Sequence, residues 1–192
     1  MRTDNLVKYL EELRDLIVEE SKKELASQGK TGKLYDSIEG TYVEKDSRGL
    51  HFRILMEDYG KFVDKGVKGK DPSKVVGGEK AIKEQQAPDS DYEFGSGNFP
   101  NTFDDFSKSV GDWAKAKNFR LRDEKGRFVR GTYETIGKII AGNIYNRGLK
   151  PSLFFTKAFE KAQKQIQDKL EKGLKLDVEK EIEIIIDTYD KN

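Results

Sequence analysis

The sequence has no cysteine and only one histidine, His51. Without cysteine the chain can form neither a disulfide bond nor a thiolate metal site, which is compatible with a reducing cytoplasm. Catalytic triads and histidine-based metal clusters need partners that a single histidine does not have. We therefore predict a structural role for His51 in a strand, and we expect a protein that is not an enzyme, with no catalytic residue, no metal and no cofactor.

The chain also lacks an excess of charge of either sign and lacks a long hydrophobic run. Its 36 lysines and arginines nearly balance 35 aspartates and glutamates, for a formal net charge of +1. This balance argues against a strongly basic nucleic-acid-binding domain, although it allows local basic patches. The first residues form a helix-like pattern with charges throughout, unlike a signal peptide or a membrane span. We expect a soluble protein that stays inside the cell that makes it, with no membrane partner.

What the chain does contain is a series of regular apolar patterns. In four segments apolar residues recur every three or four positions, which predicts amphipathic helices. These segments span about 4–28, 103–117, 132–146 and 151–170. Pro151 suits the first turn of the last of these helices.

Two pairs of short β-prone segments indicate antiparallel hairpins. In the first pair, residues 41–45 and 50–56 flank a turn signal, and the alternation in 50–56 predicts that one face is buried. In the second pair, residues 119–122 and 127–130 alternate apolar residues with arginine on both sides of a turn. The order of helices and hairpins contains no regular strand–helix–strand alternation, so we predict an α+β fold.

Two further stretches fit neither pattern. Residues from about 67 to 103 carry few aliphatic side chains and several glycine and proline clusters, so we predict a long loop insertion that is functional or mobile rather than core. The C-terminal extension from about 174 to 192 fits a helix or a strand, and Asp177 as a helix cap favours the helix. Together these features predict a single domain over residues 1–192.

Acidic and glycine-rich positions form no distinct catalytic pattern. The carboxylates at 57–58, 64 and 104–105 are better explained by turns and helix starts than by acid–base or magnesium chemistry. The glycines of 77–78 and 95–97 lack the residues that complete a phosphate-binding loop or a dinucleotide fingerprint. A hydrolase that uses these carboxylates is therefore the weakest of the functions considered.

Arginines are concentrated in the second hairpin, at Arg120, Arg122, Arg127 and Arg130. Guanidinium groups bind phosphates and carboxylates in the same forked geometry, so this strip suits either a nucleic acid or an acidic protein partner. The alternative is that the strip is the solvated face of an exposed hairpin. Trp113 and the phenylalanines around it are expected in the core or at a subunit contact rather than stacked on bases.

Three short stretches stand out in chain order: residues 31–38, TGKLYDSI; residues 59–66, YGKFVDKG; and residues 148–155, GLKPSLFF. In this order they resemble the head-tail joining and tail-completion proteins of tailed bacteriophages. In that family the first stretch precedes the sheet, the second closes it and the third opens a final helix. Residues 112–117, DWAKAK, look most like the versions found in crAss-like phages. The chain has Val67 where the family often has threonine.

The resemblance implies a structural virion protein without enzymatic activity. Such proteins assemble into a homo-oligomeric ring, with sixfold or twelvefold symmetry, in the neck or at tail completion, next to portal, connector or tail proteins. The ring contributes to head-tail joining and to the DNA passage, with non-specific proximity to packaged DNA. The implied location is the neck or tail region of the virion, after synthesis in the host bacterial cytoplasm. The implied fold is a small antiparallel curved sheet packed by a long N-terminal helix and by C-terminal helices.

These observations select two sets of residues. A ring needs an interface in which one face of each subunit meets a different face of the next. The candidates for partner or subunit contacts are Arg120, Arg122, Arg127, Arg130, Phe94 and Phe99. The structural candidates are Gly32, Leu34, Tyr59, Phe62, Val63, Gly66, Trp113, Gly148, Pro151 and Phe154, of which Tyr59, Phe62 and Val63 are expected in the core. The alternative function is a small nucleic-acid-binding regulatory protein that uses the arginine-rich hairpin 120–130.

Overall fold

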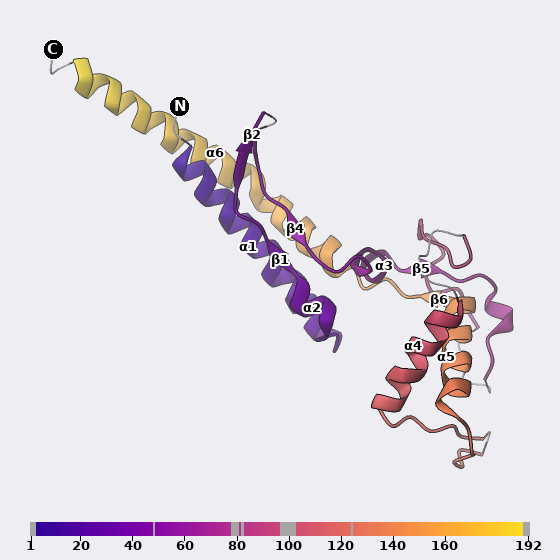
Figure 1. The fold of residues 1–192 in the computed structure, drawn as a ribbon. Helices are drawn as coiled ribbons and strands as arrows, with labels where there is room; N and C mark the ends of the chain where they lie inside the picture. The colour runs from indigo at the N-terminus through magenta and orange to yellow at the C-terminus, as the bar shows by residue number, and fades with distance from the viewer. Residues whose placement is uncertain are drawn as a thin grey trace. The chain divides into compact units, whose positions relative to one another are not determined.

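The fold is α+β, as the order of the sequence patterns predicts (Figure 1). The computed structural model describes residues 3–47, 49–77, 81, 83–96, 103–123 and 125–189, and of residues 181–189 it describes only the backbone. The α-helices of these residues are α1 (Asp4–Ser27), α2 (Lys33–Ser37), α3 (Gly60–Lys65), α4 (Phe103–Ala116), α5 (Tyr133–Arg147) and α6 (Phe154–Tyr189). Their strands are β1 (Glu39–Gly40), β2 (Glu44–Asp46), β3 (Gly49–His51), β4 (Ile54–Leu55), β5 (Val67–Lys68) and β6 (Gly148–Leu149), and a 3-10 turn, η1, spans Pro72–Lys74.

The helices confirm the segments that apolar periodicity predicts, except that the last helix begins later than predicted. The bounds of α1, α4 and α5 agree closely with the predicted segments, and α6 continues through the C-terminal extension to Tyr189. The described part of that extension is therefore helix and not strand. The placement of Pro151 in the first turn of the last helix is wrong, because α6 begins only at Phe154. Leu153 has a left-handed φ of 54°, which a right-handed helix does not allow.

The chain folds into two compact units. Unit 1 comprises residues 1–60 and 153–192, and unit 2 comprises residues 61–152. The chain therefore passes between the units twice, at residues 60–61 and 152–153. The single domain predicted over residues 1–192 stays a prediction, because two compact units of one chain can form one domain or two.

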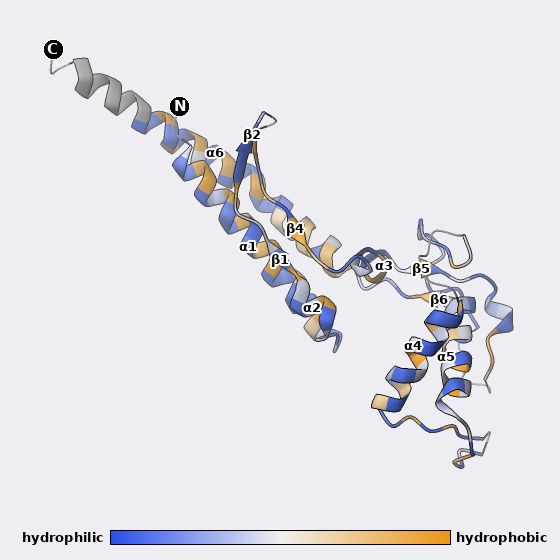
Figure 2. Cartoon of the chain, viewed as in Figure 1, coloured by the Kyte–Doolittle hydropathy of each residue, from blue (hydrophilic) through white to orange (hydrophobic). Residues whose placement is uncertain are grey.

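Unit 1 is built on the side-by-side packing of α1 and α6 (Figure 1). Figure 2 shows hydrophilic and hydrophobic residues following one another along both helices, as their amphipathic patterns require. Leu13, Ile17 and Leu25 of α1 are buried, and so are small residues of α6 such as Ala162. A Cβ atom added to Gly173 of α6 would lie only 3.1 Å from the Cα atom of Leu6, so the two backbones approach closely there.

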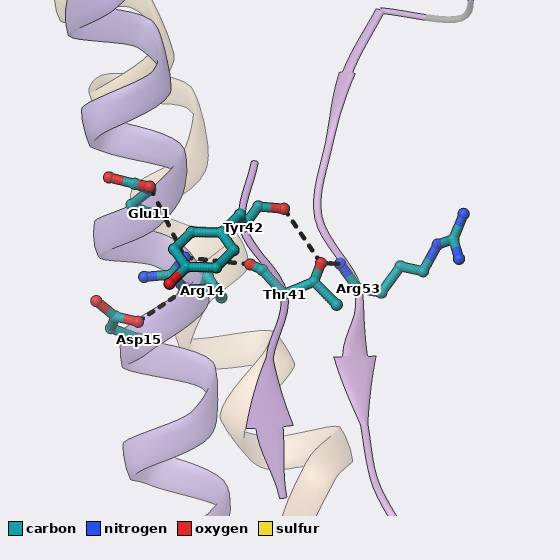
Figure 3. Close-up of polar contacts among 6 residues, drawn as sticks. All are labelled: Glu11, Arg14, Asp15, Thr41, Tyr42 and Arg53. Carbon is teal, nitrogen blue, oxygen red and sulfur yellow. Dashed lines mark hydrogen bonds and ion pairs between the residues drawn. The ribbon is translucent and has the colours of Figure 1, made fainter. Parts of the chain in front are cut away.

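The first predicted hairpin is present in unit 1. β2 pairs antiparallel with β3, and β1 pairs antiparallel with β4 further from the turn. Figure 3 shows how Arg14 of α1 reaches this hairpin: its Nη1 donates to the Thr41 carbonyl oxygen at 3.1 Å. The Thr41 hydroxyl accepts in turn from the Arg53 backbone N–H at 2.9 Å. The predicted buried face is wrong for β2, whose three residues are all exposed, since the contact with α1 is made near β1.

His51 lies in β3, opposite Glu44 of β2. This confirms its predicted position on a strand. Its Nε2 atom is 3.6 Å from a Glu44 carboxylate oxygen, and its Nδ1 atom is 3.8 Å from Asp46. Both carboxylates belong to the same hairpin, so the surroundings of His51 are those of a cross-strand residue.

Unit 2 is built on the packing of α4 against α5, which two glycines allow. A Cβ atom added to Gly137 would lie 2.3 Å from the Ser107 carbonyl oxygen and 2.8 Å from the Gly111 nitrogen. The strands β5 and β6 pair antiparallel beside these helices, with Val67 opposite Leu149.

The prediction that residues 67–103 are a loop outside the core is wrong in part. Val67, Val75 and Ala87 are among the buried apolar residues of unit 2. The Gln85 side-chain oxygen accepts from the Gly69 N–H at 2.6 Å, and the Gln85 side-chain NH₂ group donates to the Gly69 carbonyl oxygen at 2.8 Å. These few apolar positions are buried because backbone and amide hydrogen bonds fix the irregular chain around them, and no periodic apolar pattern indicates this.

Candidate interaction surfaces

Two of the stretches that carry the phage resemblance meet inside unit 2. The Val63 carbonyl oxygen accepts from the Ser152 backbone N–H at 3.0 Å and from the Ser152 hydroxyl at 2.8 Å. Gly66 has a φ of 74°, and a Cβ atom added there would lie 2.5 Å from the Leu149 carbonyl oxygen. Residues 61–66 and 148–152 are therefore in direct contact, and glycine is required at position 66 both by its backbone angle and by lack of space.

The other structural candidates differ in burial. Leu34 and Phe154 are buried in unit 1, and Gly148, with a φ of 92°, is buried in unit 2. Phe62 and Val63 are half-buried. The expected burial of Tyr59 is wrong: its side chain is 41% exposed because it lies in the turn closed by the hydrogen bond from the Gly60 N–H to the Glu57 carbonyl.

Gly32 and Trp113 complete this set. Gly32 directly precedes the first residue of α2 in an extended conformation, which places it at the start of that helix. Trp113 is 47% exposed, so the core position is wrong for it within one chain. The subunit contact that was the other expectation for Trp113 stays a prediction.

A basic–aromatic surface lies at the end of α4 and in the loop that leads to α5. We define it as Trp113, Lys117, Phe119, Arg120, Arg122 and Phe128. All six residues are exposed, with Phe128 at 58%. The rings of Trp113 and Phe119 are 4.9 Å apart between centroids. A shallow depression is lined by Asn118 and by every residue of this surface except Trp113. Exposed aromatic rings beside cationic groups are typical of binding surfaces.

A tight turn holds the loop of this surface in shape. Asp123 accepts hydrogen bonds from the backbone N–H groups of Lys125 and Arg127, at 3.0 and 2.8 Å, and from the Arg127 side chain at 2.8 Å. The pKa of the Asp123 carboxyl lies below its ordinary value, and the hydrogen bond from the Arg127 backbone N–H is the largest cause. Desolvation has a smaller effect in the opposite direction. Gly126 supplies the left-handed residue of the turn, with a φ of 78°.

The second predicted hairpin is reduced to this turn and one antiparallel bridge, between Arg122 and Phe128. Two backbone hydrogen bonds flank this bridge: the Asp123 N–H donates to the Arg127 carbonyl oxygen at 2.8 Å, and the Val129 N–H donates to the Leu121 carbonyl oxygen at 3.0 Å. The predicted hairpin is therefore confirmed as a short antiparallel pairing but not as two strands. Most residues of both arms are exposed, so little burial supports a longer ladder.

The four arginines do not share one arrangement. The guanidinium carbon of Arg122 is 4.1 Å from the Phe128 ring centroid and that of Arg120 is 5.6 Å from it. Arg122 also donates to the Gly126 carbonyl oxygen at 2.8 Å, which positions its side chain. Arg127 instead forms an ion pair with Asp123 at 2.8 Å, and Arg130 is exposed. The structure thus brings Arg120 and Arg122 together on one ring and assigns Arg127 to the turn.

Of the two phenylalanines predicted at contacts, Phe94 belongs to an aromatic cluster of unit 2. Its ring centroid is 5.4 Å from that of Tyr145 and 6.2 Å from that of Phe106. Phe94 is half-buried, so part of its area remains for a partner. Phe99 lies outside the described residues.

A second candidate surface lies on α6, next to Asp177. Asp177, expected to cap its own helix, is buried in α6 and accepts from the backbone N–H groups of Asn5 and Leu6, both at 3.0 Å. It caps α1 instead. Because α1 begins at this level, α6 continues past it from Asp177 to Tyr189 (Figure 1). Leu174 and Val178, at 47% and 39% exposure, are uncovered apolar residues beside the cap.

Comparisons of the chain with protein-family models, with curated proteins and with solved structures found no match in any of the three. Within the described residues no group of histidines, cysteines and carboxylates is placed to hold a metal ion. In the same part of the chain, no helix is long and apolar enough to cross a membrane.

Proposed function

We propose that this protein is a structural virion protein that forms a homo-oligomeric ring at the head-tail interface of a tailed phage, as a neck or tail-completion subunit. The observation that carries the proposal is the contact between residues 61–66 and 148–152, through Val63 and Ser152. These stretches are far apart in the sequence, and both resemble the same family. Their contact supports reading them as parts of a single family-like arrangement rather than as unrelated short matches.

The two candidate surfaces also support assembly. A ring is closed by heterologous contacts, which need two different exposed surfaces on each subunit. The basic–aromatic surface belongs to unit 2, and the uncovered face of α6 at Leu174 and Val178 belongs to unit 1. In the proposed ring, with sixfold or twelvefold symmetry, such surfaces serve contacts with neighbouring subunits and with portal, connector or tail proteins. The role is structural, at the passage of the DNA, and involves no catalysis.

Native mass spectrometry and negative-stain microscopy of the full chain test this proposal. The protein is examined alone and together with the portal protein of the same particle. We expect closed rings, or a complex in which several copies join the portal. A protein that stays monomeric under both conditions, and is missing from purified particles, would exclude the proposed function.

A second candidate function is a nucleic-acid-binding regulator. It is favoured by the exposed pair of Trp113 and Phe119 next to Lys117 and Arg120, because stacking rings combined with cations bind single strands. It predicts affinity for a single-stranded oligonucleotide that falls steeply with salt and falls further in an Arg120→Ala, Arg122→Ala variant.

The matched control for that variant removes two exposed lysines elsewhere, in Lys45→Ala, Lys164→Ala. If both double variants and the natural chain bind the oligonucleotide equally at every salt concentration, the regulator is excluded. If only the arginine variant loses binding and no ring forms, this second function replaces the first.

A further inference from the structure

The end of α6 exposes two apolar residues near the start of α1, and the sequence pattern extends this apolar stripe toward the C-terminus. Leu174 and Val178 lie one helical turn apart and are exposed. The sequence continues the same spacing with Ile182, Ile185 and Tyr189. Asp177 binds the first amides of α1, so the helix that covers the earlier part of α6 does not extend past this level. We call residues 174–189 the distal α6 segment.

The distal α6 segment is also acidic. Residues 179–189 contain Glu179, Glu181, Glu183 and Asp187 against one basic residue, Lys180. An apolar stripe on an acidic helix suits a partner that offers apolar area and positive charge together. Two such segments side by side would place like charges close to one another, and a nucleic acid would repel the carboxylates.

The basic–aromatic surface has the complementary character. Residues 113–131 contain seven lysines and arginines against two acidic residues. Within it, the exposed rings of Trp113, Phe119 and Phe128 supply apolar area at 47, 44 and 58% exposure. Arg122 is held over Phe128 at 4.1 Å and by its bond to the Gly126 carbonyl, so its remaining N–H groups are oriented before any partner binds.

We propose that the distal α6 segment of one copy of this chain docks on the basic–aromatic surface of a second copy. The apolar stripe of the segment packs on Trp113, Phe119 and Phe128, while its carboxylates pair with Arg120 and Arg122. The contact joins two different surfaces of one chain, so it is heterologous and can be repeated around a ring. It rests on the proposed function for its biological setting, since it supplies the subunit contact of that ring.

Reversal of charge on each surface tests the pairing. One variant carries Arg120→Glu and Arg122→Glu, and another carries Glu179→Lys and Glu183→Lys. The mass of the full chain in solution is followed by light scattering over a concentration series, at about 0.05 M and about 0.5 M salt. We expect the natural chain to associate more tightly at low salt and each variant alone to weaken association at least about tenfold. Lys45→Glu, Lys164→Glu, which reverses two exposed lysines elsewhere, is the matched control and should associate like the natural chain.

Mixing the two reversed variants gives the sharper result. The unchanged surface of the Glu179→Lys, Glu183→Lys variant complements the unchanged segment of the Arg120→Glu, Arg122→Glu variant, and the two reversed elements also carry opposite charges. We therefore expect association to return in the mixture, with circular dichroism confirming that each variant is folded. Variants that associate normally on their own, or a mixture that stays as weak as its components, would overturn the proposal.

The lack of natural cysteine allows a direct test of proximity. Copies that carry only Phe128→Cys are mixed with copies that carry only Val178→Cys and are oxidised. A disulfide-linked heterodimer is expected, whereas Lys45→Cys in place of Phe128→Cys should give none. A chain that carries both cysteines is oxidised in parallel. A disulfide that forms within this chain, but not between the two single-cysteine copies, would refute docking between copies.

The same measurements separate this contact from the proposed function. Rings that form equally well with both surfaces reversed would keep the ring and reject this contact. Association that depends on both surfaces but stops at a closed dimer would keep the contact and count against the ring. If Arg120→Glu, Arg122→Glu abolishes oligonucleotide binding but leaves the association of copies unchanged, the basic–aromatic surface binds a nucleic acid and the proposed contact is rejected.

Discussion

Replacement of Asp177 by asparagine should release the start of α1 and destabilise unit 1. The carboxylate is 1% exposed and accepts three hydrogen bonds, two at Oδ1 and one at Oδ2. The donors are the Asn5 backbone N–H at 3.0 Å, the Asn5 side-chain amide at 2.8 Å and the Leu6 backbone N–H at 3.0 Å. The two backbone donors belong to the first turn of α1, where amides have no partner within the helix.

The magnitude follows from what asparagine keeps and what it loses. Asparagine has the same shape as aspartate, but one carboxylate oxygen is replaced by an NH₂ group, which then faces an N–H donor. The negative charge that strengthened all three hydrogen bonds is also lost. A hydrogen bond to a charged group contributes about 1.5–3 kcal/mol and loss of a helix cap costs about 0.5–2 kcal/mol, so we expect Asp177→Asn to lower the free energy of unfolding by about 1–3 kcal/mol. Asp177→Ala should lower it more, because it removes every acceptor and leaves a cavity.

Urea unfolding followed by far-UV circular dichroism measures this loss. The matched control is Asp168→Asn, which makes the same chemical change at an exposed position of α6. Hydrogen exchange at the amides of Asn5 and Leu6 reports on the cap itself and should become faster only in the Asp177 variant. Equal urea midpoints for the two variants, with unchanged exchange at both amides, would refute the role assigned to Asp177.

The pH dependence of the same difference has a defined sign. Burial opposes ionisation of Asp177, but the bonds from the Asn5 and Leu6 backbone and from the Asn5 side chain together lower its pKa below the ordinary value. A carboxyl with a lowered pKa in the folded state stabilises the fold above its unfolded pKa, about 3.9, and this contribution is lost as the pH falls through the folded value. The gap between the natural chain and Asp177→Asn should therefore be full at neutral pH and narrow below about pH 4. A gap that widens on acidification would contradict this reasoning.

Three further substitutions test packing. Gly137→Ala should lower the free energy of unfolding by about 1–3 kcal/mol, because its Cβ would lie 2.3 Å from the Ser107 carbonyl oxygen and would push α4 away from α5. Gly142→Ala, in the same helix with nothing within 4 Å, is its control and should raise that free energy by up to about 1 kcal/mol in the same urea titration. Gly66→Ala combines a φ of 74° with a Cβ 2.5 Å from a carbonyl oxygen, so we expect a lower melting temperature and a loss of at least about 2 kcal/mol. Phe62→Ala should cost about 1–3 kcal/mol rather than the 3–5 kcal/mol of a fully buried phenylalanine, since Phe62 is half-buried, and a loss above that range in a thermal melt would mean that its burial is greater.

Local patterns predict much of the fold. α1, α4 and α5 follow from apolar spacing, and the first hairpin follows from a turn signal between two β-prone segments. These features depend on residues within a few positions of one another, which a sequence displays directly.

Contacts between distant segments could not be predicted in the same way. Asp177 is a residue type that often caps helices, but the amide it binds belongs to Asn5, 172 positions earlier in the first turn of α1. Val67 follows a glycine turn in a polar stretch, and only its pairing with Leu149 buries it. In each case the partner is chosen by the packing of whole helices and strands, so no neighbouring residue in the sequence indicates it.

The candidate surfaces were predicted in part. The concentration of arginine in 120–130 is visible in the sequence, but alternation alone suggested paired strands and four equivalent side chains. The structure shows one bridge, with Arg122 over Phe128 and Arg127 paired to Asp123. The sequence leaves Trp113 either in the core or at a subunit contact, and its exposure in the structure excludes only the core within one chain. Phe128 is exposed as well, which its residue type does not indicate because a large aromatic residue is more often buried.

Reconstruction of the particles made in cells that produce this protein, by electron cryomicroscopy, examines the ring proposal itself. The expected result is a closed ring of identical copies between the portal and the tail, in which the contact between 61–66 and 148–152 is kept within every subunit. Density for this chain only in the capsid shell or the distal tail, or particles that contain none of it and still join heads to tails, would show that it is not a neck or tail-completion subunit.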